Sequence, residues 1–541
     1  MESASSESIN AALLAFLRTP ESYPWKPAQV RSTETHISWV FFPSPFVYKI
    51  KKPINLQFAD FSTLAKRRYF CERELELNRR LSDDVYLEVV PIYVTDEGFS
   101  FSEGAGQIVE YAVKMRELPR GWFLHELLAE GAVGEKEIGR LIARLCRFYH
   151  SQIPTTEIAS WGHPEKLRIS TDENFEQVRT FIGQTISEPA LAAIRAFTNG
   201  FLDHQEQLFQ QRIEQRWIRD CHGDLRLEHV HLTPETVTIF DCIEFNDRFR
   251  FIDVANDLAF LAMDFDFESH PELGGLFLRQ ASQGLHDPGL LKVVTFYKSY
   301  RAFVRGKVES IQAAVDKEEA SGHLARARRY FRLALRYSVF GSKPVLLVVL
   351  GPVASGKTTV ARALAAELGW PLFSSDVIRK GLAGVPLTGR LPPAMRTKLY
   401  APEMSDRTYA ELLRQGRAAL GNADGVVLDA TFSDPARRDR LREVCNQPGI
   451  GLQMVELSAP HEEIVERLRK RSRNADEVSD ARLEDLKQLN AVYHPPGPDE
   501  SDVLPVKTSG PVATTLEVIL LRLARQHALE TDKDISMSSL G

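Results

Sequence analysis

The chain has 541 residues, of which 43% are hydrophobic and 26% charged, and its formal net charge is -6. This composition is typical of a globular protein and excludes a largely disordered chain, while the length predicts several domains or two large ones. The negative charge gives no general reason to expect nucleic acid as a partner. Five widely spaced cysteines without a C-x-x-C pair fit a reduced, cytoplasmic compartment. Uninterrupted apolar runs such as 345–350 are too short to span a membrane.

The chain begins with a predicted N-terminal helical extension, residues 1–30. Its apolar run 11–17 follows acidic residues instead of the basic residues of a secretion signal. Residues 36–50 then alternate aromatic or β-branched side chains with polar ones around a Pro-Ser-Pro turn, which predicts a β-hairpin. In the second strand of this hairpin, Lys49 and Lys51 project from the same face.

The next segment, 62–81, is charged and is predicted to form a helix. Its acidic residues include Glu72 and Glu74, either of which can pair with a lysine of the preceding strand. Most such charged side chains are simply solvated. Glu72, Glu74 and the lysines are therefore candidate functional residues only if a motif elsewhere in the chain supports them.

That motif is the segment Cys221-His222-Gly223-Asp224. An H-x-D loop holds a carboxylate where it can accept the proton of an attacking hydroxyl group. His229 follows five residues after the aspartate, and a strand-like run, 237–240, then ends in Asp241. A second aspartate after a short strand can hold the magnesium ion of ATP.

Residues 30 to about 310 resemble the aminoglycoside phosphotransferase branch of the protein-kinase-like fold. The resemblance rests on His222, Asp224 and Asp241, together with Asp253 and Asp257 in the segment Phe251-Ile-Asp-Val-Ala-Asn-Asp-Leu-Ala.

The resemblance implies an α+β kinase-like domain, 31–341, that binds ATP and Mg²⁺. It makes Asp224 the catalytic base and Asp241 the principal metal ligand. Lys49 becomes the lysine that contacts phosphate, with Glu74 or Glu72 as its partner on the helix.

The chain departs from this family at two places. The family usually has asparagine five residues after the base, where this chain has His229, whose imidazole can bind a metal ion but suits magnesium poorly. In addition, no glycine lies between Thr35 and Phe46, so a glycine-rich loop does not precede Lys49. A degenerate kinase fold that binds nucleotide or regulates is therefore the alternative to an active one.

Helices are predicted beyond Asp257, as far as the basic run 326–336. Arginines alternate there with aromatic and leucine residues, which favours a packed amphipathic helix over a nucleic-acid-binding patch. Gly341-Ser342-Lys343-Pro344 breaks this helix, and we place a domain boundary there, with a second domain at 342–525.

A phosphate-binding loop of the pattern G-x-x-x-x-G-K-T follows the apolar, strand-like run 345–350. Two glycines let the backbone turn tightly, so that successive N–H groups and the N-terminus of the helix after the loop point at one anion. Lys357 is expected to reach the β and γ phosphates, and Thr358 to take one position on a magnesium ion. The residues predicted to bind nucleotide here are Gly351, Pro352, Val353, Ala354, Ser355, Gly356, Lys357, Thr358 and Thr359.

Asp376 follows a second strand-like run, 371–374, and Arg379 lies one helical turn further on. Ligands bind at the C-terminal ends of strands in an open parallel sheet, so Asp376 is expected to face the phosphate-binding loop. It can then orient or deprotonate an acceptor hydroxyl group, while Arg379 holds an acceptor or the transferred phosphate. The alternative is an N-capping aspartate with a surface arginine.

A buried-strand pattern, 425–429, ends in Asp429, which can support magnesium through water or hold substrate. After a further strand, 452–457, the basic segment 462–473 is predicted to be a helix with Arg467 and Arg471 on one face. It can act as a lid that closes on phosphates or simply present a solvated face.

Residues 344 to about 525 resemble the small P-loop kinases, which include gluconate kinase, the 5′-hydroxyl polynucleotide kinases and the zeta-type toxins. The resemblance rests on the phosphate-binding loop, Asp376 and Arg379, Asp429, and the Arg467/Arg471 helix with Ser479-Asp480-Ala481 after it. It implies an α/β domain with a mainly parallel sheet, so the whole chain resembles a bacterial two-domain protein. The polar residues 526–541 are predicted to be a disordered tail.

The favoured function is transfer of the γ-phosphate of ATP to a hydroxyl group of a small molecule, with Asp376, Lys357 and the lid arginines at work in the C-terminal domain. One alternative is an ATP-binding regulatory switch with a degenerate N-terminal kinase fold. The other is a polynucleotide 5′-hydroxyl kinase, which needs a basic groove for a single strand. The sequence identifies neither the acceptor nor the oligomeric state.

Overall fold

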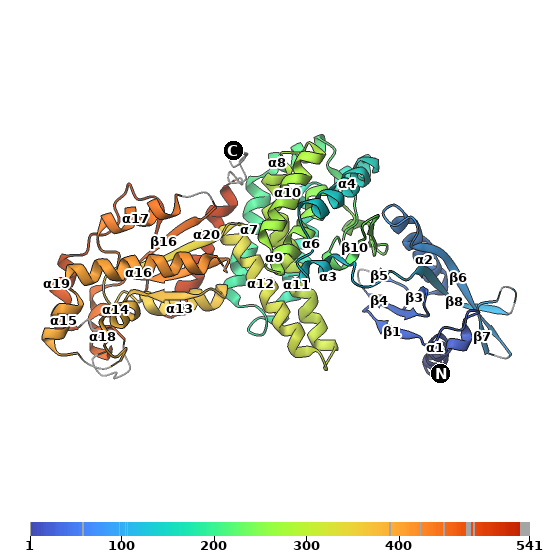
Figure 1. Cartoon of the computed structure of the whole chain (residues 1–541), viewed down its shortest axis with the longest axis horizontal. Coiled ribbons are helices and arrows are strands. Elements are labelled where there is room, and N and C mark those ends of the chain that lie inside the picture. Colours follow the sequence, from blue (N-terminus) through green and yellow to red (C-terminus); the bar gives the residue numbers. More distant parts are fainter. Residues whose placement is uncertain are drawn as a thin grey trace. The chain divides into compact units, whose positions relative to one another are not determined.

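The computed structural model describes residues 2–56, 59–96, 98–102, 104, 106–388, 391–421, 423–446, 449–471, 478–479 and 482–530. The chain divides into two compact units, and Figure 1 labels their helices and strands. Unit 1 comprises Met1–Leu167 and Gln207–Tyr297, and unit 2 comprises Arg168–Glu206 and Lys298–Gly541. Each unit is described by itself below.

Unit 1 begins with an N-terminal helix and a six-stranded antiparallel sheet in the order β1-β2-β3-β8-β6-β7. Its first elements are α1 (Glu2–Arg18), β1 (Arg31–Glu34), β2 (Ser38–Phe42), β3 (Phe46–Lys51), β4 (Asn55–Leu56), β5 (Ala59–Asp60), α2 (Leu64–Arg79), β6 (Tyr86–Thr95), β7 (Gly98–Ser100) and β8 (Gln107–Arg116). The hairpin β2–β3 and the helix α2 were predicted from the sequence, and both predictions are confirmed.

The two faces of β3 explain why its side chains alternate. Tyr48 and Ile50 pack with Leu13 and Leu17 of α1 on one face of the sheet. Val47 packs on the other face with Cys71 of α2. Lys49 and Lys51 share the face of Val47, as the period of two requires, and both reach α2.

The rest of unit 1 is mainly helical, with short strands that carry the loops of interest. Its elements are α3 (Leu124–Ala129), α4 (Glu135–Ser151), α5 (Thr156–Ser160), α8 (Glu206–Glu214), β9 (Ile218–Asp220), β10 (Val230–Leu232), β11 (Val237–Ile239), β12 (Phe251–Asp253), α9 (Val254–Phe267) and α10 (Pro271–Leu285). Strand β12 pairs with β9, and β10 pairs with β11. Helix α9 is buried along its whole length, which fixes the loops packed against it.

Unit 2 contains a five-stranded, wholly parallel sheet in the order β14-β15-β13-β16-β17, which confirms the predicted parallel α/β architecture. The elements of the sheet region are β13 (Val345–Leu350), α13 (Lys357–Leu368), β14 (Leu372–Ser374), α14 (Ser375–Ala383), α15 (Pro393–Leu399), α16 (Pro402–Leu420), β15 (Gly425–Asp429), α17 (Pro435–Cys445), β16 (Gly451–Ser458), α18 (His461–Arg471), α19 (Leu486–Ala491), β17 (Val503–Lys507) and α20 (Val512–Leu529).

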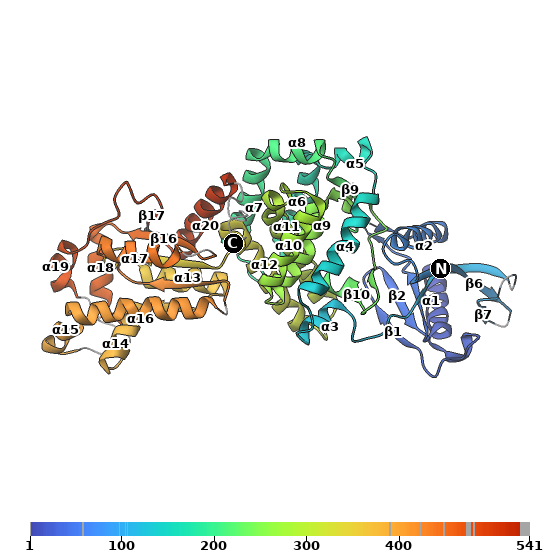
Figure 2. The same ribbon diagram turned by 45° about the horizontal axis from the view of Figure 1, so that its top comes forward.

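The central strand β13 is buried at every position, because helices cover both faces of the sheet. Leu346, Val348 and Leu350 pack with residues of α14, α16 and α17 on one face. Helices α13 and α20 pack against each other and against the sheet (Figures 1 and 2). This arrangement brings the C-terminal ends of five parallel strands to one edge, where the phosphate-binding loop follows β13.

Four further helices have residues in unit 2: α6 (Pro164–Val178), α7 (Glu188–His204), α11 (Leu290–Val315) and α12 (Ala320–Phe340). Helix α12 contains the predicted basic run and buries its apolar residues, as expected for a packed amphipathic helix. Gly341 ends it with a φ of 76°. Helices α7 and α12 nevertheless pack on α20, so the compact units do not divide at Gly341. A folding boundary at that residue stays a prediction.

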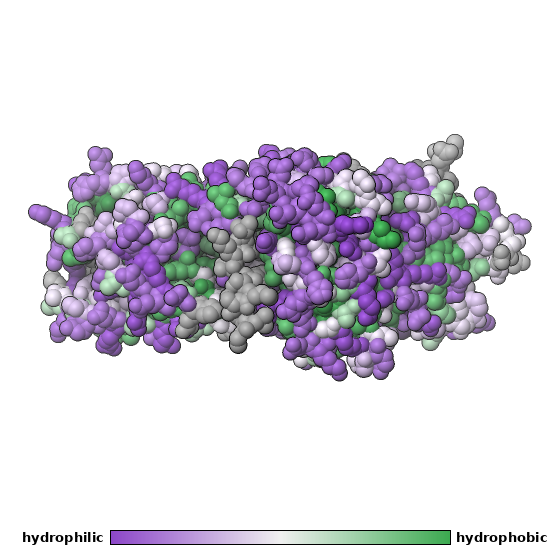
Figure 3. Space-filling view, turned by 90° about the horizontal axis from the view of Figure 1, so that it is seen from above, coloured by the Kyte–Doolittle hydropathy of each residue, from purple (hydrophilic) through white to green (hydrophobic). Residues whose placement is uncertain are grey.

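Helix α20 continues to Leu529, four residues into the segment predicted as a tail, and residues 531–541 lie outside the described part of the chain. In the described ranges no helix is both long and apolar enough to cross a membrane. Figure 3 shows hydrophilic residues over most of the visible surface, with hydrophobic residues in small separate patches.

Candidate functional site

The phosphate-binding loop in unit 2 has the geometry that its glycines predict. Gly351 has a φ of 139°, and a Cβ atom there would lie 2.2 Å from the carbonyl oxygen of Leu457 on β16. Gly356 has a φ of 98° and caps the N-terminus of α13. Only glycine fits at position 351 without a shift of the backbone. The tight turn of the loop therefore depends on the glycine that the sequence has there.

The two reactive side chains of this loop lie at the start of α13. Lys357 Nζ donates a hydrogen bond to the Pro352 carbonyl oxygen at 2.7 Å, and burial lowers the pKa of this amine to about 8. Thr358 Oγ1 donates to Asp429 Oδ2 at 2.8 Å. Asp429 is 3% exposed at the end of β15, and burial raises the pKa of its carboxyl group. The hydroxyl and carboxylate oxygens form a donor set that suits magnesium.

Asp376 belongs to the same cluster. It lies in the first turn of α14, directly after β14, and its charge acts on both Lys357 and Asp429. The N-cap of α14 is Ser374, so Asp376 does not have the capping role that was the alternative. The ends of β13, β14 and β15 thus bring Lys357, Asp376 and Asp429 together, as predicted for a parallel sheet.

Arg379 is placed differently from the prediction. It is 6% exposed, donates to the Leu399 carbonyl oxygen at 3.2 Å and to Ser405 Oγ at 3.0 Å, and stacks on the Tyr400 ring. These contacts hold α15 and α16 against α14. A role of Arg379 towards an acceptor or a phosphate stays a prediction.

Hydrogen bonds of Arg467 connect α18 to the phosphate-binding loop. Its guanidinium group donates to the Ala354 carbonyl oxygen at 3.3 Å and to the Thr508 carbonyl oxygen at 2.7 Å. Arg471, one turn further on, lies close enough to lower the pKa of Lys357. Arg473 of the predicted lid helix, and Asp480 and Ala481 of the segment after it, lie outside the described residues.

Thr508 is a site residue that sequence reasoning missed. Its hydroxyl group donates to the Ser355 carbonyl oxygen at 2.6 Å and also contacts Arg467. It directly follows β17, so it lies at the same sheet edge as the phosphate-binding loop. A prediction of this last parallel strand would have found it.

A second cluster of charges lies in unit 1. Lys49 Nζ contacts Glu74 Oε1 at 2.8 Å and Asp241 Oδ1 at 2.6 Å. Burial opposes the charge of Lys49, but Asp241 and Glu74 outweigh it and raise the lysine pKa well above its usual value. Glu72 instead pairs with Arg68 at the surface. Of the two carboxylates considered from the sequence, Glu74 is therefore the one that meets Lys49.

Lys51 joins this cluster from the same strand. Its fully buried ammonium group contacts Glu74 Oε2 at 2.7 Å and also bonds to Glu244. Glu74 is thus shared by two lysines, and Glu244 ties the segment after Asp241 to β3. The only feature of the sequence that could have pointed to Glu244 is that it lies three residues after Asp241.

The H-x-D loop is held by a carboxylate on α9. Asp257 is fully buried and accepts hydrogen bonds from the backbone N–H groups of His222 at 3.0 Å and Gly223 at 2.9 Å, and from Tyr149 Oη at 2.9 Å. Asp257 therefore positions the loop, while Asp224 keeps 31% of its side chain exposed. Asp253 is bound to Arg212 and caps α9.

His229 lies between the two aspartates that were predicted to act. Its Nδ1 atom is 2.8 Å from the Asp224 carbonyl oxygen, and its Nε2 atom is 3.7 Å from Asp241 Oδ2. The structure thus brings Lys49, Glu74, Asp224, Asp241 and His229 into one site.

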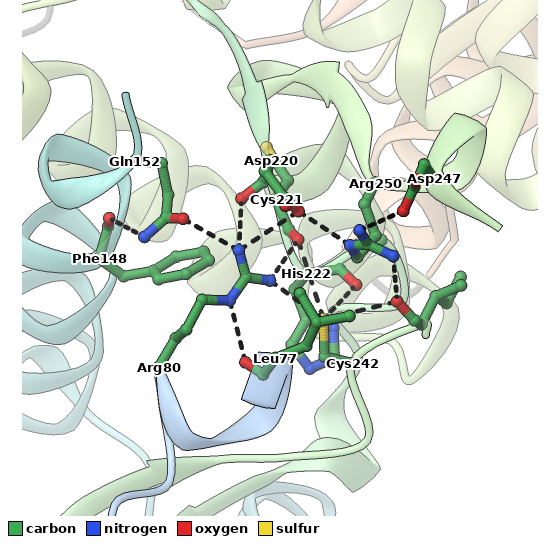
Figure 4. A network of polar contacts seen from close by, with 12 residues as sticks. Leu77, Arg80, Phe148, Gln152, Asp220, Cys221, His222, Cys242, Asp247 and Arg250 are labelled. Atoms are coloured by element: carbon green, nitrogen blue, oxygen red, sulfur yellow. Dashed lines mark hydrogen bonds and ion pairs between the residues drawn. The ribbon is translucent and has the colours of Figure 1, made fainter. Parts of the chain in front are cut away.

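Arg80, just after α2, connects this site's helix to both aspartate-bearing segments (Figure 4). Its guanidinium group donates to the carbonyl oxygens of Asp220 and Cys221, which precede His222, both at 3.2 Å. It also donates to Cys242 Sγ, next to Asp241, at 3.4 Å. Nothing in the local sequence pattern indicated this role.

Comparison with known proteins finds similarity in both halves of the chain. A family model described as "AAA domain" matches residues 346–496, which include Lys357, Thr358, Asp376 and Asp429. "Uncharacterized protein Rv2004c" of Mycobacterium tuberculosis H37Rv is 30% identical over 405 residues, covering 75% of this chain and 79% of the relative. "Uncharacterized protein Mb2027c" of Mycobacterium bovis matches to the same extent.

Two solved structures illustrate the similarities. A gluconokinase from Sinorhizobium meliloti 1021 is 24% identical, covers 34% of this chain and 94% of its own, and has a TM-score of 0.24. A choline/ethanolamine kinase family protein from Mesorhizobium loti is 14% identical, covers 59% of this chain and 97% of its own, and has a TM-score of 0.33. The family model and the loop geometry together show a P-loop nucleotide-binding domain in unit 2.

Proposed function

We propose that this chain transfers the γ-phosphoryl group of ATP to a hydroxyl group of a small molecule. The chain belongs to the same protein family as Rv2004c of Mycobacterium tuberculosis. The reaction takes place at the phosphate-binding loop of unit 2. The observation that carries the proposal is the position of Asp376, in the first turn of α14, where its charge acts on both Lys357 and Asp429. The pair of Thr358 and Asp429 serves Mg²⁺–ATP in any loop of this kind, so Asp376 is the additional carboxylate that an acceptor hydroxyl group needs.

Each of these side chains has a chemical role that its position supports. Lys357 now bonds to its own loop at Pro352, and an incoming phosphate replaces that carbonyl oxygen as its partner. Thr358 and Asp429 would hold Mg²⁺, which supplies charge neutralisation at the phosphates when it is bound. Asp376 orients the acceptor hydroxyl group and accepts its proton, and its position at a strand end supports this role.

The test is ATP consumption by the full chain in the presence of sugars, nucleosides, aminoglycosides or 5′-hydroxyl oligonucleotides. With an acceptor that stimulates turnover, Asp376→Asn is expected to lower kcat by about 10²-fold or more, because it removes the proton acceptor. Asp439→Asn, at an exposed carboxylate that pairs with Arg442 on α17, is the matched control and keeps full turnover. Acceptor-dependent turnover that survives Lys357→Ala would refute the proposal.

We also propose that unit 1 binds a second metal–nucleotide complex. Lys49 within 2.8 Å of both Glu74 and Asp241, with Asp224 nearby, supports this second site. If nucleotide bound there is not consumed, unit 1 acts as a regulatory switch. We expect the Lys357→Ala chain to bind nucleotide still, and a further Lys49→Ala substitution to abolish that binding. A Lys357→Ala chain that binds no nucleotide contradicts this second proposal.

A further inference from the structure

The tautomer of the neutral His229 ring in unit 1 follows from one hydrogen bond. Its Nδ1 atom lies 2.8 Å from the Asp224 carbonyl oxygen, which can only accept. Nδ1 therefore carries the hydrogen and donates it. In the neutral ring the lone pair is then on Nε2.

The Nε2 atom faces carboxylate oxygens. It lies 3.7 Å from Asp241 Oδ2 and 3.7 Å from Glu228 Oε1. The other oxygen of Asp241, Oδ1, is held by Lys49, so Oδ2 is the one turned toward the imidazole. Two adjacent ligands of one metal ion, with bonds of about 2.1 Å, lie roughly 3 Å apart, so a shift of well under 1 Å completes the pair.

The surroundings hold this pair in place. His229 is 8% exposed, and its ring packs against Phe240, which immediately precedes Asp241. Asp241 keeps 41% of its side chain exposed, so one side of the pair is open to a ligand. Glu228 is half-exposed and bonded to Arg226, so we do not count it as a ligand.

We propose that the metal–nucleotide site of unit 1 takes a first-row transition-metal ion such as Mn²⁺ in preference to Mg²⁺, with His229 Nε2 and Asp241 Oδ2 as its protein ligands. Imidazole nitrogen binds such ions well, whereas magnesium prefers oxygen ligands. In the parts of the chain that the structure describes, no three His, Cys, Asp or Glu side chains are grouped to hold a metal ion by themselves. The phosphates of the nucleotide therefore complete the coordination. This inference rests on the second nucleotide site proposed above and is independent of the chemistry in unit 2.

The experiment uses the full chain with Lys357→Ala, which silences the phosphate-binding loop of unit 2. Fluorescent MANT-ATP is titrated with either Mn²⁺ or Mg²⁺. We expect Mn²⁺ to support binding on the order of tenfold more tightly than Mg²⁺. His229→Asn keeps a donor near the position of Nδ1 but removes the Nε2 lone pair, so it should bring the two dissociation constants close together, mainly by weakening the Mn²⁺ complex.

The matched control is His231→Gln. The Nε2 atom of His231 contacts the Pro119 carbonyl oxygen at 3.0 Å, and the glutamine amide can replace that donor. This variant should keep the metal preference. A second readout needs no substitution at His229: electron spin echo spectra of bound Mn²⁺–ATP should show coupling to an imidazole ¹⁴N nucleus.

The outcomes separate the two proposals. If the Lys357→Ala chain binds no MANT-ATP with either metal, both the second nucleotide site and this inference fall. If it binds, but the spectrum lacks ¹⁴N coupling or His229→Asn leaves the Mn²⁺-to-Mg²⁺ ratio unchanged, the second site stands and the inference is overturned. The second pattern would mean that His229 packs beside Asp241 without binding the metal ion.

Discussion

Nucleotide binding at the phosphate-binding loop should weaken as the pH rises from 7 to 9. Burial lowers the pKa of Lys357 to about 8, below its usual value of 10.5, and Asp429 and Asp376 offset only part of this effect. The phosphate groups of ATP are fully ionised by pH 8 and require the charged form of the lysine. Binding therefore takes up a proton whenever the free amine is neutral.

The magnitude follows from that pKa. At pH 7 nearly all Lys357 side chains are charged, whereas at pH 9 only about one in ten is. The affinity should therefore fall about tenfold over this interval, or ~1.4 kcal/mol. The folded protein also binds fewer protons than the unfolded chain between pH 8 and 10.5, so this group makes the free energy of unfolding rise through that window.

The assay is titration of MANT-ATP with Mg²⁺ at half-unit pH steps, using the binding component that Lys357→Ala removes. Lys357→Arg is the matched variant, because arginine keeps its charge throughout this range. Its affinity should be lower at pH 7, where the arginine does not fit the lysine's place, but independent of pH up to 9. A tenfold fall in the arginine variant as well, or a flat profile in the parent chain, would refute the reasoning.

Three further predictions concern the residues that hold the two sites. Glu74→Gln leaves two buried lysines short of a carboxylate and should lower the free energy of unfolding by about 3 kcal/mol or more in urea denaturation, whereas Glu72→Gln should change it by less than about 0.5 kcal/mol. Equal effects would contradict the assignment of Glu74. Gly351→Ala should abolish binding at the phosphate-binding loop while the second site still binds MANT-ATP, because its Cβ would meet backbone; retained affinity would show that the loop relaxes freely. Arg80→Lys should weaken MANT-ATP binding in a Lys357→Ala background, since an amine cannot make the forked contacts with two carbonyl oxygens, and unaltered binding would make Arg80 a merely structural residue.

The phosphate-binding loop could be predicted because its function depends on local backbone. The strand, the two glycines and the helix are contiguous, and each follows from residues within a few positions. Asp376 and Asp429 could be placed beside the loop because parallel strands bring their C-terminal ends to one edge, whatever the intervening sequence.

The sequence could not supply contacts that depend on packing across long separations. Arg379 is one helical turn from Asp376, which favoured a role at the phosphates, and only the fold shows that one nitrogen of its guanidinium group bonds to α15 and α16. Asp257 matched a family segment without a stated role, and only the fold shows that it holds the H-x-D loop. Arg80 acts on carbonyl oxygens about 140 residues away, which no periodicity encodes.

If unit 1 binds nucleotide as proposed, the charge cluster around Lys49 also sets the order in which ligands can enter it. Two lysines and three carboxylates are joined there, namely Lys49, Lys51, Glu74, Asp241 and Glu244, and Asp224 lies nearby, so carboxylates outnumber lysines. A nucleotide arriving without a cation meets this excess and finds Lys49 already engaged by Asp241. A divalent cation reverses the balance and competes with Lys49 for that aspartate. Unit 1 should therefore admit the nucleotide only as its metal complex, and chelation of divalent ions should empty this site before it empties the phosphate-binding loop.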